Sequence, residues 1–326
     1  MKRLGAWLWR LAPHVPAFKE TLDELRWLRQ ENHFLREELR RKKLPPAPVP
    51  PVAAALGVRG LCEVMNPGRY EQVDWLALHA DLERYALDRH CFQSFNGAVY
   101  RKGWEWTHCV YGLRELGMLQ PHHRALGVGA GRECVIFYLA DHIAQVTATD
   151  LYGAVEWSGD GGKEADPGLL EQAKDRVPAT VDFTRIRFET RDGTNLGFAD
   201  NSFDLAWSLS SIEHFGGHQA AHRALQELGR VVRPGGVVAV ATEFVLLEEH
   251  EHPEYFTRSQ ILALAASASP TMELIGDINF DTLTYEYLVD SIALPAARDR
   301  KRRHVVLNDG DIQWTSAMLF FRKKER

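Results

Sequence analysis

The stretch best suited to ligand chemistry is "ALGVGAGRE", residues 125–133, where an apolar run turns over Gly129 and Gly131 and then meets Glu133. Glycine turns of this type commonly hold an anion at the free N–H groups of a helix N-terminus. A carboxylate at the start of that helix would repel such an anion. Asp150 closes "QVTATD" about 20 residues further on, where an acid accepts hydrogen bonds from ribose hydroxyls. Together these features predict a nucleoside-containing ligand.

The choice of nucleoside depends on Glu133. NAD would bring a pyrophosphate with two negative charges to the helix start, whereas S-adenosylmethionine brings a sulfonium, an ammonium and one carboxylate. One unfavourable charge pair at about 4 Å costs up to about 4 kcal/mol at an effective dielectric constant near 20, and much less if exposed. The sequence therefore favours S-adenosylmethionine over an NAD-dependent oxidoreductase. In the alternative interpretation, Glu133 only stabilises the helix dipole and touches no ligand.

Glu213 and His214 are the candidate catalytic residues, since they directly follow a predicted strand. Methyl transfer needs an aligned nucleophile and, for a hydroxyl acceptor, a base. The imidazole of His214 ordinarily titrates near working pH, which makes it the candidate base. Alternatively, the pair only supports the turn. His218 and His222, one helical turn apart, could join His214 at a zinc ion, but an exposed helix face is the better interpretation, and we expect no metal.

A parallel sheet is the element that must position these residues. From His123 onward, β-branched runs alternate with helical patterns, which is typical of a parallel sheet with helices on both faces. Strands are predicted over 125–129, 145–149, 184–189, 203–209 and 236–242, with helices beginning near 132, 168, 217 and 257. Ligands of such sheets lie across the carboxyl ends of the strands. The residues just after each strand are therefore the ones to examine.

Two further stretches carry a family resemblance: "RDGTNLGFADNSFDLAWSLSSIEHF" and "ALQELGRVVRPGGVVAVATEF". With the glycine turn and Asp150, they resemble the class I, Rossmann-like S-adenosylmethionine-dependent methyltransferases, over roughly residues 119–245 and more loosely to the end. The resemblance implies an α/β fold with a doubly wound, mostly parallel seven-stranded sheet and helices on both faces. Two positions depart from the family pattern: Glu133 stands where a third glycine is common, and Gly127 where an acid is common.

The resemblance also implies a set of cofactor-binding residues. The glycine turn would approach the methionine part, the acid after the second strand would hold the ribose, and an Asp-Gly pair would meet the adenine amino group. Serines after the fourth strand would line the floor beside the methionine part. The implied residues are Gly129, Ala130, Gly131, Glu133, Asp150, Leu151, Asp192, Gly193, Ser208 and Ser210. Some relatives complete a magnesium shell with a glutamate where this chain has Ser210, so that route to a metal is absent.

The N-terminal part of the chain reads as two helical segments. Residues 1–16 place apolar side chains on one helical face among basic ones, a pattern typical of a short interfacial helix in peripheral contact with a membrane. The alternative is a stripe packed on its own protein. Residues 17–43 lack glycine and proline, and a heptad register puts Asn32 at a core a position. We expect a parallel coiled-coil homo-oligomer here, or else an amphipathic helix lying on its own domain.

Residues 44–55 form a proline-rich linker, and proline favours an extended, semi-rigid spacer. Residues 56–118 are mostly helical and aromatic, and we interpret them as a lid over the ligand, with Tyr100, Arg101 and Trp104 as its contacts. The methyltransferase domain is expected over residues 119–326.

Composition narrows the function classes. The 326 residues carry a net charge of −5, which gives no general reason to expect a nucleic-acid partner. The four cysteines are widely separated, which favours a reducing cytoplasm. The basic run "RDRKRRH", 298–304, is an exposed loop or a second membrane contact.

The acceptor is less constrained by sequence than the cofactor. A stalk, a rigid spacer and a surface contact suggest work on something large or membrane-attached, so we expect O-methylation of a sugar hydroxyl on a cell-surface glycan or its lipid-linked precursor. The alternatives are a small-molecule O- or N-methyltransferase and a coiled-coil scaffold whose methyltransferase domain is inactive.

Overall fold

A computed structural model describes residues 60–87, 92, 99–151, 173–293 and 304–325. Pro51–Arg326 forms one compact unit. The segments predicted as an amphipathic helix (1–16), a coiled coil (17–43) and a linker (44–55) lie outside the described residues, as do the helix start near 168 and all but the last residue of the basic run. Among the described residues, no helix is both long and apolar enough to cross a membrane.

The centre of the unit is a sheet in which ten strands are described. The strands are β1 (Glu63–Val64), β2 (Arg124–Val128), β3 (Gln145–Asp150), β4 (Ile186–Thr190), β5 (Phe203–Leu209), β6 (Val232–Val245), β7 (Met272–Leu274), β8 (Ile292–Ala293), β9 (Leu307–Asn308) and β10 (Gln313–Lys323). The described sheet thus has ten strands where seven were expected, and three of them, β1, β8 and β9, have only two residues each.

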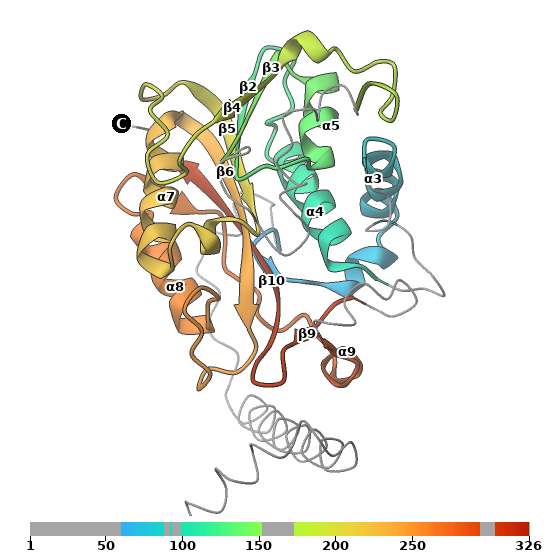
Figure 1. Ribbon diagram of the computed structural model, residues 1–326, viewed down its shortest axis with the longest axis vertical. Helices are drawn as coiled ribbons and strands as arrows, with labels where there is room; N and C mark the ends of the chain where they lie inside the picture. The colour runs from blue at the N-terminus through green and yellow to red at the C-terminus, as the bar shows by residue number, and fades with distance from the viewer. Residues whose placement is uncertain (1–59, 88–91, 93–98, 152–172, 294–303, 326) are drawn as a thin grey trace, which may run out of the picture. The chain divides into compact units, whose positions relative to one another are not determined.

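The strand order is β4-β3-β2-β5-β6-β10-β9-β8, with β1 and β7 also paired to β10 (Figure 1). The strands β4, β3, β2, β5 and β6 run parallel to one another, so their carboxyl ends share one edge. Strand β10 runs antiparallel to β6 over the register Trp314↔Val245 to Arg322↔Val237. The expected mostly parallel α/β sheet is confirmed, with one long antiparallel strand beside it.

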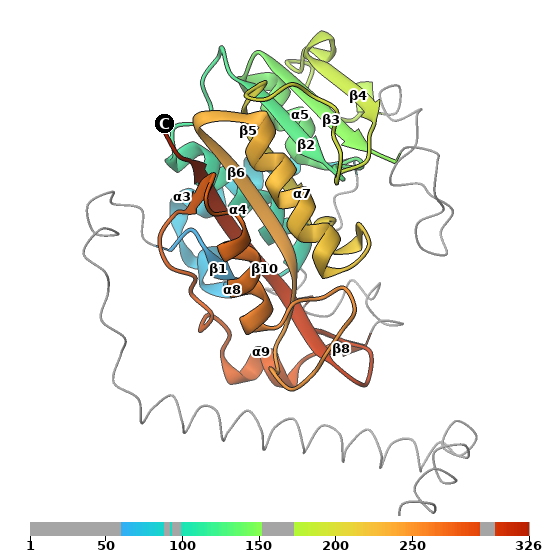
Figure 2. The same ribbon diagram turned by 90° about the vertical axis from the view of Figure 1, so that its left-hand side faces the viewer.

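Helices cover both faces of this sheet. They are α3 (Val73–Glu83), α4 (Arg101–Glu115), α5 (Cys134–His142), α7 (His218–Val231), α8 (Arg258–Ser267) and α9 (Tyr285–Val289), with short 3-10 turns η3 (Pro67–Glu71), η6 (Phe183–Arg185) and η7 (Ile212–His214). Helices α4 and α5 pack on one face, with α3 against them, and α7 and α8 pack on the other. Figure 2 shows α7 and α8 in front of the sheet.

The sequence explains why these elements form. In α7, apolar residues recur at helical spacing and are buried, whereas the opposite face is polar. Helix α5 begins with seven consecutive buried residues because it lies inside the unit. The apolar run of β6 is buried from Val237 to Val245, as expected of a strand covered on both faces. The chain turns from α7 into β6 at "RPGG", where the pairing register with β5 shifts.

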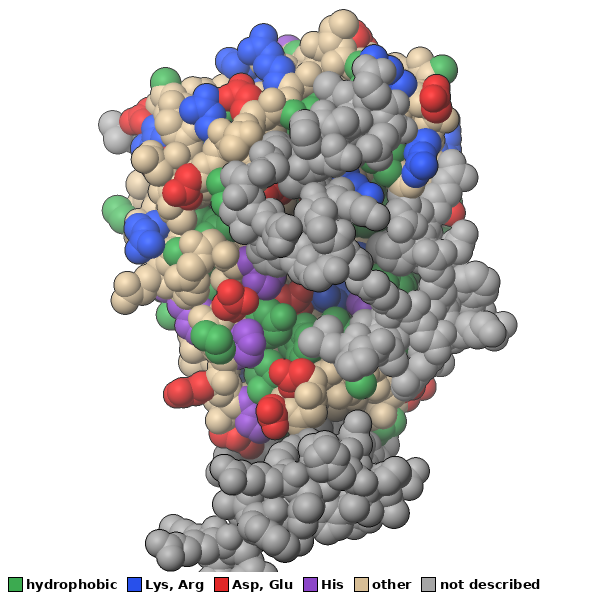
Figure 3. Space-filling model, viewed as in Figure 1, with side chains coloured by type: hydrophobic (Ala, Val, Ile, Leu, Met, Phe, Trp, Pro, Cys, Tyr) green, Lys and Arg blue, Asp and Glu red, His purple; other side chains and the backbone are tan. Residues whose placement is uncertain are grey.

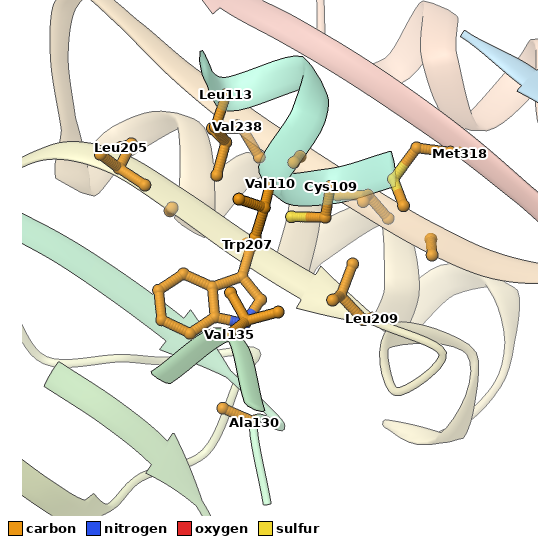
Figure 4. Packing of buried hydrophobic residues seen from close by; sticks show 14 of the residues in the cluster. Cys109, Val110, Leu113, Ala130, Val135, Leu205, Trp207, Leu209, Val238 and Met318 are labelled. Atoms are coloured by element: carbon orange, nitrogen blue, oxygen red, sulfur yellow. The ribbon is translucent and has the colours of Figure 1, made fainter. Parts of the chain in front are cut away.

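The core between the sheet and α4 is drawn in Figure 4. Trp207 of β5 lies among Val110 of α4 and Val135 of α5, and all three are buried. Because successive strand residues face opposite sides, Ser208 must face the α7 side of the sheet. The alternation thus places Trp207 and Ser208, which are neighbours in sequence, on opposite faces of the sheet.

The helical section before the sheet belongs to the same compact unit as the sheet. Helix α4 packs against β6 and β10 rather than standing over the sheet edge. Trp104, expected at a lid, has no exposed surface, and Arg101 is 5% exposed. The indole of Trp104 packs on His108, one turn along the same helix, with ring centroids 5.0 Å apart. A ligand contact by Trp104 stays a prediction.

Candidate functional site at the carboxyl edge of the sheet

The glycine turn follows β2 at the carboxyl edge. Gly129 has φ +63° and Gly131 has φ +45°, backbone conformations that favour glycine. A Cβ added to Gly129 would lie 2.5 Å from the Cβ of Ser211, whose hydroxyl donates to the carbonyl of Gly129 at 2.8 Å. The turn is therefore held against the loop after β5, and the absence of a side chain keeps this approach possible.

Asp150 ends β3 beside the same turn. Its Oδ2 accepts a hydrogen bond from the N–H of Gly131 at 2.9 Å, and its Oδ1 accepts from the N–H of Leu151 at 2.7 Å. The carboxylate thus ties the second strand to the glycine turn at the edge where a ribose is expected. A glycine turn with a carboxylate at its side fits the nucleoside part of S-adenosylmethionine.

The loop after β4 contributes Asp192 and Gly193. The carboxylate of Asp192 accepts from the N–H of Thr194 at 2.8 Å and from its hydroxyl at 2.7 Å, which closes a tight turn. Gly193 is buried against the ring of Phe215, which also borders Gly129. The structure therefore brings the predicted adenine-side pair and the glycine turn to the same aromatic ring.

The two positions that depart from the family pattern, Gly127 and Glu133, both contact Trp207. A Cβ on Gly127 would come within 2.5 Å of the indole of Trp207, so glycine makes room for that ring. The indole Nε1 donates to Oε2 of Glu133 at 2.9 Å. Burial raises the pKa of Glu133 well above its ordinary value. The carboxyl thus contacts an indole inside the core.

This geometry bears on the electrostatic argument made from Glu133. The residue is 8% exposed, and its contact is Trp207 rather than an open crevice. A raised pKa also favours the uncharged form. The expectation that a charged Glu133 repels a diphosphate is not supported by these contacts, so the choice of cofactor has to rest on other evidence.

Ser208 and Ser210 have different surroundings. Ser208 lies within β5 with no exposed surface, and its hydroxyl has no hydrogen-bond partner among the described residues. Ser210 follows the strand with φ +47°, an uncommon conformation for a residue other than glycine. Its hydroxyl donates to Oε2 of Glu105 at 2.9 Å. Of the two, only Ser210 is placed at the loop that borders the glycine turn.

His214 pairs with Glu254, which lies in a segment, "EEHEHPEYF", whose acids and histidines the sequence indicated as candidate substrate contacts. Its Nδ1 lies 2.9 Å from Oε2 of Glu254, and its ring meets Tyr255 edge-on, with centroids 6.2 Å apart. Glu254 and Tyr255 belong to the segment after β6, 248–256, which also stacks His252 on Tyr255. The acidic, histidine-rich composition of "EEHEHPEYF" was the available signal for this pairing.

Glu213 lies deeper than its neighbour His214. It has no exposed surface, and its Oε2 accepts from the hydroxyl of Thr242 at 3.0 Å. Burial, reinforced by the charge of Glu243, raises the pKa of Glu213 to about 8. The structure thus assigns the two candidate catalytic residues different surroundings: His214 at the edge with Glu254, and Glu213 inside with Thr242.

A buried charged group connects Glu213 to helix α4, and we call it the α4 cluster. Its members are Arg101, Lys102, Glu105, Glu213, Glu243 and Ser316. Arg101 donates to Glu243, to Ser316 and, at 3.2 Å, to Glu105. Figure 3 shows acidic, basic and histidine side chains beside hydrophobic ones around a hollow near the middle of one face. Sequence reasoning found Arg101 but not its partners.

Histidines of α7 have separate contacts. Nε2 of His218 lies 2.9 Å from the carbonyl of Tyr255. Burial and the neighbouring His218 lower the pKa of His222. Within the described part of the chain, no group of three or more His, Cys, Asp or Glu residues is arranged to hold a metal ion.

Part of the chain around this edge is similar to known methyltransferases. Residues 161–240 match the family model described as a methyltransferase domain. The chain is 31% identical over 154 residues to methyltransferase GfsG of Streptomyces halstedii, covering 45% of this chain and 51% of that protein. It is 28% identical over 127 residues to O-methyltransferase resE of Aspergillus sclerotiorum, covering 38% and 46%. The chain spans about half the length of these curated relatives.

Among solved structures, the chain resembles Phospholethanolamine N-methyltransferase 2 of Haemonchus contortus, which was solved with phosphomonomethylethanolamine and S-adenosylhomocysteine. The TM-score is 0.46 at 14% identity, covering 82% of this chain and 61% of that one.

Proposed function

We propose that the chain is a class I, Rossmann-like S-adenosylmethionine-dependent methyltransferase and that it methylates a hydroxyl oxygen of its acceptor. The match of residues 161–240 to a methyltransferase-domain model and the 31% identity to a named methyltransferase support this. When bound, S-adenosylmethionine supplies an electrophilic methyl group. The residues that would hold it are the glycine turn, Asp150 with Leu151, and the pair Asp192 and Gly193. The protein's remaining task is to orient the acceptor oxygen and to remove its proton.

The observation that carries this proposal is the pairing of His214 with Glu254 at the carboxyl edge, with 2.9 Å between Nδ1 and Oε2. A carboxylate at Nδ1 favours the tautomer with its proton on that nitrogen, which makes Nε2 the nitrogen that takes up a proton. His214 then accepts the proton that the acceptor hydroxyl loses, and Glu254 stabilises the resulting imidazolium. An acceptor nitrogen or carbon would have less need of such a pair.

For the acceptor, we propose a sugar hydroxyl on a cell-surface glycan or its lipid-linked precursor. The name O-methyltransferase of one relative supports oxygen as the acceptor atom. The alternatives are a small-molecule O- or N-methyltransferase and a scaffold whose methyltransferase domain is inactive. We also propose that residues 17–43 join copies of the chain in parallel, that 1–16 contacts a membrane surface peripherally, and that the protein works in the cytoplasm.

Incubation with S-adenosylmethionine labelled in its methyl group, together with fractionated cell material, tests the proposal. We expect label in a carbohydrate-containing fraction, held by a bond that resists mild base as an ether does and an ester does not. Label in a low-molecular-mass metabolite would favour the small-molecule alternative. Cofactor binding without transfer to any fraction would favour the scaffold.

A further inference from the structure

We infer that the α4 cluster is the acceptor-recognition site and that it reads neighbouring hydroxyls of a neutral, polyhydroxylated ring. The inference rests on the proposed function and adds the residues that select the acceptor. The cluster borders both the cofactor side of the site and the proposed base. Glu105 accepts from Ser210, beside the glycine turn, and Glu213 directly precedes His214. Whatever meets the cluster therefore lies within reach of both the cofactor side and the proposed base.

Orphaned buried atoms are an independent sign that a polar partner is missing. Arg101, Glu213 and His304 are each more than nine-tenths buried, and each keeps one polar atom without a hydrogen-bond partner among the described residues: Nε, Oε1 and Nδ1 respectively. An unsatisfied buried polar group destabilises the folded protein. Arg101 lies in the fields of Glu243, Glu105 and Glu213, and His304 in those of Arg101 and Glu105, so the three groups share one region.

The charge balance of the cluster indicates an uncharged ligand. Arg101 and Lys102 provide two positive charges against the carboxylates of Glu105 and Glu243. Glu213 keeps its proton at neutral pH because burial and Glu243 raise its pKa to about 8. Burial, and then Arg101, keeps His304 neutral by lowering its pKa to about 3. An anionic or cationic acceptor would disturb this balance, whereas a neutral one would not.

The remaining groups fit a hydroxyl-rich ring. Donors on Arg101 and Lys102 bond acceptors on Glu105 and Glu243, so the cluster holds both kinds of group close together. Hydroxyls, which donate and accept, match such a mixture. Aromatic faces flank the cluster: the Tyr100 and His304 rings stack with centroids 4.2 Å apart, and Tyr255 lies in the fields of Glu243 and Arg101. A flat apolar acceptor would leave the orphaned polar atoms of Arg101, Glu213 and His304 without partners, which is costly.

Binding measurements on the intact protein saturated with S-adenosylhomocysteine test this inference without turnover. The probes are methyl glycosides of common hexoses and 6-deoxyhexoses, with 4-nitrocatechol as a planar comparison. Saturation-transfer NMR measures their binding. We expect at least one glycoside to bind and Glu243→Gln to weaken it at least tenfold. The affinity for S-adenosylhomocysteine should stay within about twofold. Glu251→Gln, an exposed acid in the segment after β6, is the matched control and should change neither affinity.

Should Glu243→Gln fail to fold, Tyr255→Phe gives the same test, because it removes one hydroxyl beside the cluster and keeps the ring; we expect a weakening of about threefold or more. The inference is overturned if no glycoside binds, or if glycosides bind the wild type and both variants with equal affinity. It is also overturned if 4-nitrocatechol binds the wild type and Glu243→Gln with the same affinity. If S-adenosylhomocysteine itself does not bind, both the proposed function and this inference fail. If S-adenosylhomocysteine binds and glycosides do not, only the acceptor assignment fails.

Discussion

At the scale of single residues, the site depends on side chains that do more than one thing. Asp150 joins β3 to the glycine turn through its bond to Gly131, and we propose that the same carboxylate holds the ribose. His214 owes its orientation to Glu254, forty residues further along the chain. Glu213, its neighbour in sequence, is held by Thr242 instead. Each of these contacts can be removed separately.

Asp150→Ala should abolish most of the stabilisation that S-adenosylmethionine gives. Charge-assisted hydrogen bonds contribute about 1.5–3 kcal/mol, so we expect affinity to fall about tenfold to a hundredfold. The measurement is the rise in melting temperature with added cofactor. Asp182→Ala, an acid outside the site whose carboxylate bonds Thr184, serves as the control. An unchanged cofactor effect would refute the assignment of Asp150.

His214→Gln should lower kcat by about 10² to 10⁴, because proton transfer by a positioned base is worth that much. Glu254→Gln should lower kcat less and move the pH profile, since it acts through the imidazole. Cofactor affinity should stay unchanged in both. His222→Gln, a half-buried histidine of α7, is the control. Equal rates for His214→Gln and wild type would show that the pair only supports the turn.

Glu213→Gln should flatten the dependence of stability on pH. The folded-state pKa of Glu213 is about 8, above the ordinary carboxyl value of about 4.3. The folded state therefore holds a proton that the unfolded state releases, so stability is fully present below about pH 4.3 and is lost as pH rises towards 8, by at most about 1.4 kcal/mol per pH unit. Melting curves from pH 5 to 9 should show the stability of the wild type falling relative to that of the variant as the pH rises. Parallel curves would contradict this.

At the scale of elements, periodicity predicted the sheet well. The strand predicted over 203–209 has those bounds in the structure, and the helix predicted to begin near 257 begins at Arg258 after a capping box formed by Thr257 and Gln260. Strand β6 is longer than predicted, since "RPGG" extends it backwards to Val232. Contacts such as Glu133 with Trp207 could not be predicted, because they join residues 74 positions apart whose orientation depends on the fold.

The bond between Glu133 and Trp207 couples α5 to β5 and offers a test at this scale. Glu133→Ala and Trp207→Phe should each reduce the free energy of unfolding by about 1–3 kcal/mol, because each leaves a buried polar group without its partner or opens a space. The double variant should lose less than the sum, with a coupling of about 0.5–3 kcal/mol. Urea denaturation of all four proteins measures it. Strict additivity would show that the two residues contribute independently.

At the scale of the whole molecule, the chain divides into two units at Pro50, and the candidate site lies entirely within the second. The helical section before the sheet is part of that unit, since α4 supplies the charged cluster beside the site. Composition could locate the boundary because prolines gather there, but it could not show that α4 belongs to the catalytic body, which depends on contacts with β6 and β10.

A shortened chain of residues 51–326 should therefore fold and bind S-adenosylmethionine with the affinity of the full chain, because its core and site residues all lie in the second unit. It should also be monomeric, whereas the full chain should form an oligomer through residues 17–43. Light scattering gives the mass of each, and calorimetry gives the affinity. Asn32→Ile in the full chain provides the matched variant, since removing the polar a-position residue relaxes register and oligomer number while keeping the association. A monomeric full chain would exclude the coiled coil, and loss of cofactor binding on shortening would show that the first unit contributes to the site.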